Sequence, residues 1–186
     1  MLLAESMNYL KIWLLSVGAA ILYGILHDQF TTRICIEYFT IAHPPIFDHT
    51  ENPTLLAFGW GTIATWWVGL GLGVPLSLVA RIGSRPKLGV PELWRPIGLL
   101  LGCMAVVSVV AGLIGWRLAA TRAAPTPSPW SALIPEERRV AFMAVAWAHA
   151  AAYQAGFLGG LALWIWAWIT RWRLARNAVQ GKSNAS

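Results

Sequence analysis

The side chains best suited to chemistry gather in one short stretch of the chain, residues 27–52. Three of the four histidines and four of the eight acidic residues fall within it. Imidazole and carboxylate groups bind zinc, iron, copper or manganese, and an open coordination position would permit catalysis. The metal-ligand candidates are His27, His43, His49 and Glu37, with Asp28, Asp48 and Glu51 as further carboxylates.

The spacing of these residues matches no compact metal-binding motif. There is no His-Glu-x-x-His and no paired Cys-x-x-Cys in the sequence. A divalent transition metal is therefore one interpretation of the histidines, and surface or turn-capping roles are the other. Haem is disfavoured, because it would need two imidazoles at matching membrane depth. The two nearest candidates, His27 and His149, are expected about two helical turns apart in depth.

The local structure of residues 28–41 is left open by the pattern. Residues 31–41 are rich in β-branched and aromatic side chains, which favours a strand. The four-residue spacing of Phe30, Ile34 and Tyr38 instead favours an interfacial helix. In both cases Arg33 and Glu37 share a face. We expect an ion pair between them that orders the loop, or an anionic group held by Arg33.

The elements that must position these residues are membrane helices. The chain is 57% hydrophobic and only 12% charged, whereas about a quarter of a soluble domain is charged. About 20 mostly apolar residues are needed to span a bilayer as a helix. The sequence predicts an all-α, four-helix transmembrane bundle in one domain, residues 1–176. Its parts are spans at about 9–26, 55–80, 97–116 and 140–169, an ordered polar outer loop at 27–54, a proline-rich outer linker at 119–135 and a disordered cytoplasmic tail at 177–186.

One ionisable residue, His149, falls inside the fourth span and shares a helix face with Tyr153. An intramembrane histidine is by default a candidate functional residue. We expect His149, Tyr153, Tyr23 and His27 to line one cavity in the outer half of the bundle. The alternative is a structural hydrogen bond from a neutral His149 to Ser108 or to a backbone carbonyl.

Lysine and arginine are distributed unequally about the spans. Nine would lie on the side of the termini and five on the opposite side, so we expect both termini in the cytoplasm. The net charge of +6 is then a consequence of topology. Nucleic-acid binding is not expected, since no soluble basic patch is present.

The run His27-Asp28-Gln29, Thr32-Arg33, Glu37-Tyr38-Phe39 and His43-Pro44 follows directly after the first span. It resembles a signature of small uncharacterised bacterial multi-pass membrane proteins. This resemblance covers about the first third of the chain, and it implies a setting in the bacterial inner membrane without implying a mechanism.

The leading functional hypothesis is a small accessory membrane subunit that binds a partner or ligand through the outer loop. Besides the lipid bilayer, its partner would be another membrane protein or a second copy of the chain. The alternatives are a metal-binding protein or metal-dependent enzyme, and a proton-linked transporter acting through His149. Whether the chain is an enzyme is not decided by the sequence. The candidate binding residues are His27, Asp28, Arg33, Glu37, Tyr38, His43, His149 and Tyr153.

Overall fold

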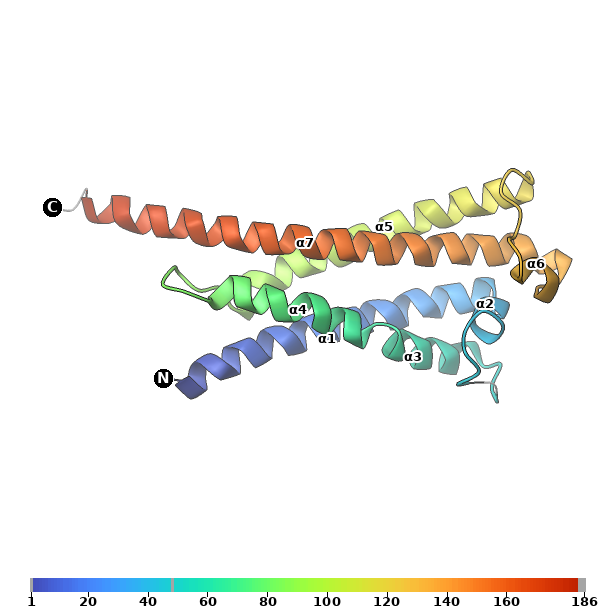
Figure 1. Ribbon diagram of the computed structural model, residues 1–186, viewed down its shortest axis with the longest axis horizontal. Helices are drawn as coiled ribbons and strands as arrows, with labels where there is room; N and C mark the ends of the chain where they lie inside the picture. The colour runs from blue at the N-terminus through green and yellow to red at the C-terminus, as the bar shows by residue number, and fades with distance from the viewer. Residues whose placement is uncertain (1, 48, 184–186) are drawn as a thin grey trace.

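Helices form nearly all of the ordered backbone in the computed structural model, which describes residues 2–47 and 49–183 (Figure 1). Four helical segments are long and apolar enough to cross a membrane, and the described part of the chain contains no strand. The four-helix prediction is confirmed. The elements are α1 (Leu2–Ile34), α2 (Glu37–Thr40), α3 (Pro53–Ile63), α4 (Trp66–Arg81), α5 (Val90–Ala120), α6 (Trp130–Leu133), η1 (Glu136–Arg138) and α7 (Arg139–Ser183).

Helix α1 continues about two turns past the predicted end of the first span. The hydroxyls of Thr31 and Thr32 donate to the carbonyls of His27 and Asp28, at 3.1 and 2.7 Å. Both threonines are buried, so their β-branched side chains pack within the bundle. The strand alternative for residues 31–41 is therefore wrong, and the first part of the predicted loop is helical with one face buried.

The second predicted span is divided into α3 and α4 by a break at Ala64 and Thr65. The Thr65 hydroxyl donates to the Gly61 carbonyl at 2.5 Å. At the break, this carbonyl is thus hydrogen-bonded by a side chain. Pro75, the one proline inside this predicted span, lies within α4 without ending it.

Glycines set the closest contacts between α1 and the α3–α4 segment. A Cβ added to Gly24 would lie 2.5 Å from the Gly61 carbonyl oxygen, and one added to Gly69 would lie 2.8 Å from the backbone carbonyl oxygen of Ser16. The pair Gly98 and Gly102 on α5 has nothing within 4 Å at either Cβ position. The small residues of α1, α3 and α4 therefore allow close packing within the chain.

The long helices form two packed pairs. Helix α5 packs along α7, and α1 packs along α3 and α4. Helix α4 also contacts α7 and joins the pairs at one end of the bundle, while α3 is packed mainly on α1. Both chain ends lie at the end that α4 and α7 close together (Figure 1).

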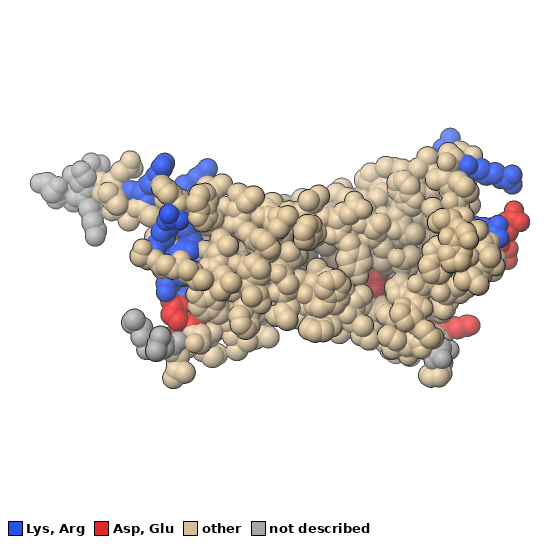
Figure 2. All heavy atoms as spheres, in the orientation of Figure 1, with Lys and Arg blue, Asp and Glu red and all other residues tan. Residues whose placement is uncertain are grey.

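Charged side chains are concentrated at the two ends of the molecule and leave a largely uncharged middle (Figure 2). At the end that carries the termini, the buried guanidinium of Arg171 donates to four backbone carbonyls where α4 ends, those of Val79, Ile82, Arg85 and Pro86. Helix α7 extends to Ser183, through most of the predicted disordered tail. Residues 184–186 of that tail lie outside the described residues.

We expect Gly24→Ala to lower the free energy of unfolding by about 1–3 kcal/mol, because the added methyl group overpacks the α1–α3 contact. Gly18→Ala on the same helix meets no atom within 4 Å and should leave stability unchanged or slightly higher. Thermal unfolding in detergent, followed by circular dichroism, measures both. Equal unfolding temperatures for the two variants would contradict the close contact.

Candidate functional site

Helices α1 and α7 bring His27, Asp28 and His149 together. His149 Nε2 lies 3.1 Å from Asp28 Oδ1, and His27 Nε2 lies 3.4 Å from His149 Nδ1. Asp28 is 6% exposed and His149 is 7% exposed. One ligand atom from each of the three residues lies within 4.8 Å of the others. We call these three residues the intramembrane cluster.

The sequence-based estimate that His27 and His149 differ in depth by about two turns is wrong. Their ring centroids are 4.5 Å apart. The estimate placed the end of the first helix at Leu26, whereas α1 ends at Ile34. The additional turns carry His27 inside the bundle, to the level of His149.

Hydrogen bonding fixes the proton on one nitrogen of His149. Its Nδ1 lies 2.9 Å from the carbonyl oxygen of Val145. A carbonyl can only accept, so in this arrangement Nδ1 carries a hydrogen and Nε2 of the neutral ring presents a lone pair to Asp28 Oδ1. Two lone pairs cannot face each other at 3.1 Å in a buried site. A cation, either a proton or a metal ion, must lie between Nε2 and Oδ1.

Ser108 orients His27 in a similar way. The Ser108 hydroxyl donates to the carbonyl of Ala148 at 3.1 Å, and its oxygen lies 3.4 Å from His27 Nδ1. Because the single hydroxyl hydrogen is used, Ser108 accepts from His27 Nδ1, and His27 Nε2 is left with a lone pair. From the sequence, Ser108 was a predicted hydrogen-bond partner of His149. In the structure, the Ser108 hydroxyl lies beside His27 instead.

The outer loop folds back over this cluster. His43 Nδ1 donates to the carbonyl oxygen of Tyr38 at 2.8 Å, and its ring lies 4.5 Å from that of Trp60 between centroids. The Tyr38 ring lies 4.6 Å from that of His149. Burial lowers the pKa of His43, which is thus neutral at pH 7. Burial also raises the pKa of Tyr38 to about 12.

The expected ion pair between Arg33 and Glu37 is replaced by other contacts. Glu37 Oε1 accepts from Arg138 Nε at 2.8 Å, and Arg33 donates to Thr54 Oγ1 at 2.9 Å. The reason is that α1 ends at Ile34, so the two residues do not share one continuous helix. Arg138 was missed because it lies 101 positions from Glu37.

Two ionisable groups at this end of the bundle share a hydrogen bond. The Cys35 thiol donates to Glu37 Oε2 at 3.2 Å. Burial and the neighbouring carboxylate raise the pKa of Cys35 to about 11, which keeps the thiol protonated. Burial alone would raise the pKa of Glu37, but hydrogen bonds, chiefly from Arg138, outweigh it and lower the pKa. Glu37 is therefore an ionised structural anchor for the loop.

The metal-ligand set expected from the sequence is not assembled as one group. His49 is exposed, Glu37 is bound to Arg138, and Asp48 lies outside the described residues. Of that set, only His27 belongs to the intramembrane cluster. The two residues that join it are Asp28, offered as a further carboxylate, and His149, assigned to a separate site. They lie 121 positions apart, too far for any sequence spacing to connect them.

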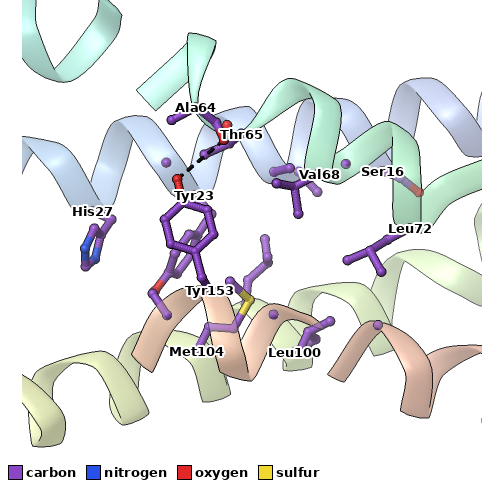
Figure 3. A pocket seen from close by; sticks show the side chains of 18 of the residues that line it. Ser16, Tyr23, His27, Ala64, Thr65, Val68, Leu72, Leu100, Met104 and Tyr153 are labelled. Carbon is purple, nitrogen blue, oxygen red and sulfur yellow. Dashed lines mark hydrogen bonds between the residues drawn. The ribbon is translucent and has the colours of Figure 1, made fainter. Parts of the chain in front are cut away.

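A cavity of about 140 Å³ opens beside the cluster between the helices. Tyr23, His27, His149 and Tyr153 all line it, as the helix-face argument expected. The Tyr153 hydroxyl donates to the Ala64 carbonyl at the α3–α4 break, 3.4 Å away (Figure 3). This break was not predicted from the sequence, because no proline lies at Ala64 or Thr65.

Comparison of the chain with protein-family models, with curated proteins and with solved structures finds no match. Function is therefore argued from the geometry of the cluster and the cavity.

We expect stability to fall as the pH drops below about 6.5, the pKa of an unperturbed imidazole. The folded state holds His43 neutral, beside His149 and Asp28, so the unfolded chain takes up the proton first and gains stability. His43→Asn keeps an N–H donor and should remove part of this decline. Unfolding temperatures measured from pH 7.5 to 5.5 test the difference, with His49→Asn in the same loop as control. Parallel pH curves for wild type and His43→Asn would contradict it.

Proposed function

We propose that this multi-pass membrane protein binds a divalent transition metal at the intramembrane cluster of His27, Asp28 and His149. One observation carries the proposal. Two imidazoles and a carboxylate from two helices gather inside the bundle, with one ligand atom of each within 4.8 Å of the others. Imidazole nitrogen and carboxylate oxygen are common ligands of zinc and of related divalent ions.

The spacing of the three ligands supports a metal. Ligand atoms at 2.0–2.2 Å from zinc lie roughly 3.4 Å apart in a tetrahedron. His149 Nε2 and Asp28 Oδ1 lie 3.1 Å apart, and one ligand atom of His27 lies within 4.8 Å of a ligand atom of each. Small side-chain movements would therefore allow all three residues to bind one ion. The fourth position remains for water or a ligand from the cavity.

Hydrogen bonds behind the cluster resemble the supporting interactions of metal sites. Metal-binding histidines generally donate their second ring nitrogen to a carbonyl, a carboxylate or water. Here His149 Nδ1 donates to the Val145 carbonyl, and His27 Nδ1 lies beside the Ser108 hydroxyl. These contacts leave Nε2 of each ring as the metal-binding atom.

The outer loop fits a supporting role better than an open partner-binding surface. Three of its candidate contact residues are engaged within the chain: Glu37 with Arg138, His43 with Tyr38, and Arg33 with Thr54. Their combined effect is to hold α2 and the following turn over the cluster. We therefore place metal binding ahead of partner binding.

The proposed setting is the bacterial inner membrane with both termini in the cytoplasm. Support comes from the charge asymmetry, because the basic residues follow the positive-inside pattern. The shared end of the two termini (Figure 1) agrees with an even number of spans. The intramembrane cluster would then lie in the outer half of the bilayer.

The wild-type protein, loaded with zinc and desalted, should retain about one ion per chain by elemental mass spectrometry. Asp28→Asn and His149→Ala should each weaken binding at least tenfold, because each removes a ligand. His49→Ala is the matched control, an exposed histidine outside the cluster, and should bind like wild type. Circular dichroism and size-exclusion profiles verify the fold of each variant.

Metal-free wild type after loading with zinc, iron, copper and manganese would contradict the proposal, as would undiminished binding by both cluster variants. The cation between His149 and Asp28 would then be a proton. That outcome favours the proton-linked alternative, in which His149→Ala abolishes a pH-dependent flux in liposomes.

A further inference from the structure

The cavity beside the cluster is long and narrow. Its lining on α1 extends from Ser16 to Asp28, which is about 18 Å of helix at 1.5 Å per residue. Spread over that length, a volume of about 140 Å³ makes the cavity narrow.

The two ends of the cavity differ in chemistry. Histidine and tyrosine side chains lie at one end, while aliphatic side chains and the thioether of Met104 line the other, together with the Ser16 hydroxyl, which donates to the Ile12 carbonyl (Figure 3). The apolar end is formed by Val68, Leu72, Leu100 and Met104. An apolar space of this kind stays dry, because water needs two to four polar partners. The gradient suits an amphiphile with its chain along the apolar end.

Two polar atoms at the polar end lack hydrogen-bond partners among the described residues, Trp60 Nε1 and Tyr23 Oη. Trp60 is only 4% exposed, and both residues line the cavity. The Tyr23 hydroxyl lies beside Ser108 but does not reach hydrogen-bonding geometry with it. An indole N–H can only donate, so its missing partner is an acceptor such as an oxygen atom.

We propose that the cavity binds a single-chain fatty acid, with the carboxylate among Trp60, Tyr23 and the cluster and the alkyl chain along the apolar end. The inference extends the metal proposal to a ligand of the same cavity, but it rests separately on the two unpartnered donors and on the shape. A bound divalent ion would strengthen it. Two neutral imidazoles and one carboxylate leave a net charge of +1 on such a site, and a fatty carboxylate would neutralise it.

A fatty acid would enter the cavity from the bilayer between α3 and α7. Helix α3 packs mainly on α1, and the Tyr153 hydroxyl bridges from α7 to the Ala64 carbonyl. Tyr153 is 43% exposed, so one face of its side chain is open to lipid. A chain-shaped ligand can enter there by displacing one long hydrogen bond of 3.4 Å.

The test uses the full chain in phosphatidylcholine nanodiscs, where no single-chain detergent competes. Palmitic acid with a photoreactive diazirine near its chain end is the probe, and labelled residues are mapped by mass spectrometry. We expect saturable labelling of the apolar lining, around Leu72, Leu100 and Met104. Excess palmitic acid should compete and hexadecane should not. Labelling confined to lipid-facing residues such as Leu99, Val106 and Leu113, without saturation, would overturn the proposal.

Two variants probe the two parts of the site. Val68→Phe fills the cavity and should abolish the saturable labelling. Trp60→Phe keeps the aromatic ring but removes the N–H donor, and should raise the half-saturating palmitic acid concentration roughly fivefold. Trp67→Phe is the control, since Trp67 is 57% exposed and lies outside the cavity lining. Unchanged labelling in Val68→Phe overturns the chain position, and an unchanged midpoint in Trp60→Phe overturns the carboxylate position.

Labelling is measured both in chelator-treated protein and in zinc-loaded protein. Saturable labelling in the chelated protein supports the fatty-acid site even if no metal binds. Zinc binding without saturable labelling in either sample supports the metal site and overturns the fatty-acid site. The failure of one proposal is thus distinguished from the failure of the other.

Discussion

The contact between Asp28 and His149 constrains the rest of the structure. A carboxyl group inside a membrane bundle is costly unless it is paired, and here its partner comes from the last helix. The pairing requires α1 and α7 to meet at one depth. It also requires the additional turns of α1 beyond Leu26, because only those turns place Asp28 inside the bundle. The position of the outer loop, which begins where α1 ends, follows from the same constraint.

The outer loop and the helix ends satisfy their polar groups within the chain. Arg138 donates to the Ile34 carbonyl where α1 ends and also holds Glu37. His43 bonds the Tyr38 carbonyl, so the loop carries its own supporting hydrogen bonds. Trp60 and Tyr23 are the exceptions, because the Trp60 N–H and the Tyr23 hydroxyl are buried and have no partner in the described part of the chain. Unsatisfied buried polar groups are rare in folded proteins, which makes these two informative about a ligand.

Much of the fold could be predicted from composition, because four long apolar segments must form helices in lipid. Helical spacing could also predict that Tyr23 shares a face with His27, and His149 with Tyr153. That His27 and His149 lie at one depth could not be predicted, because the end of α1 was placed too early. The end of α1 could not, because Thr31 and Thr32 have strand-like propensity that burial overrides. The partners of Glu37 and Asp28 lie more than 100 positions away, and no local pattern contains that information.

The arginine cap on α4 has a consequence for how the bundle can move. Arg171 ties the end of α4 and the following turn to α7 through four backbone carbonyls. The break at Ala64 and Thr65 separates α3 from this fastened part. Helix α4 is therefore fastened to α7 at the end that carries the termini, whereas α3 is joined to α4 only through the break. A change in the angle between α3 and α4 would leave the contacts of Arg171 in place.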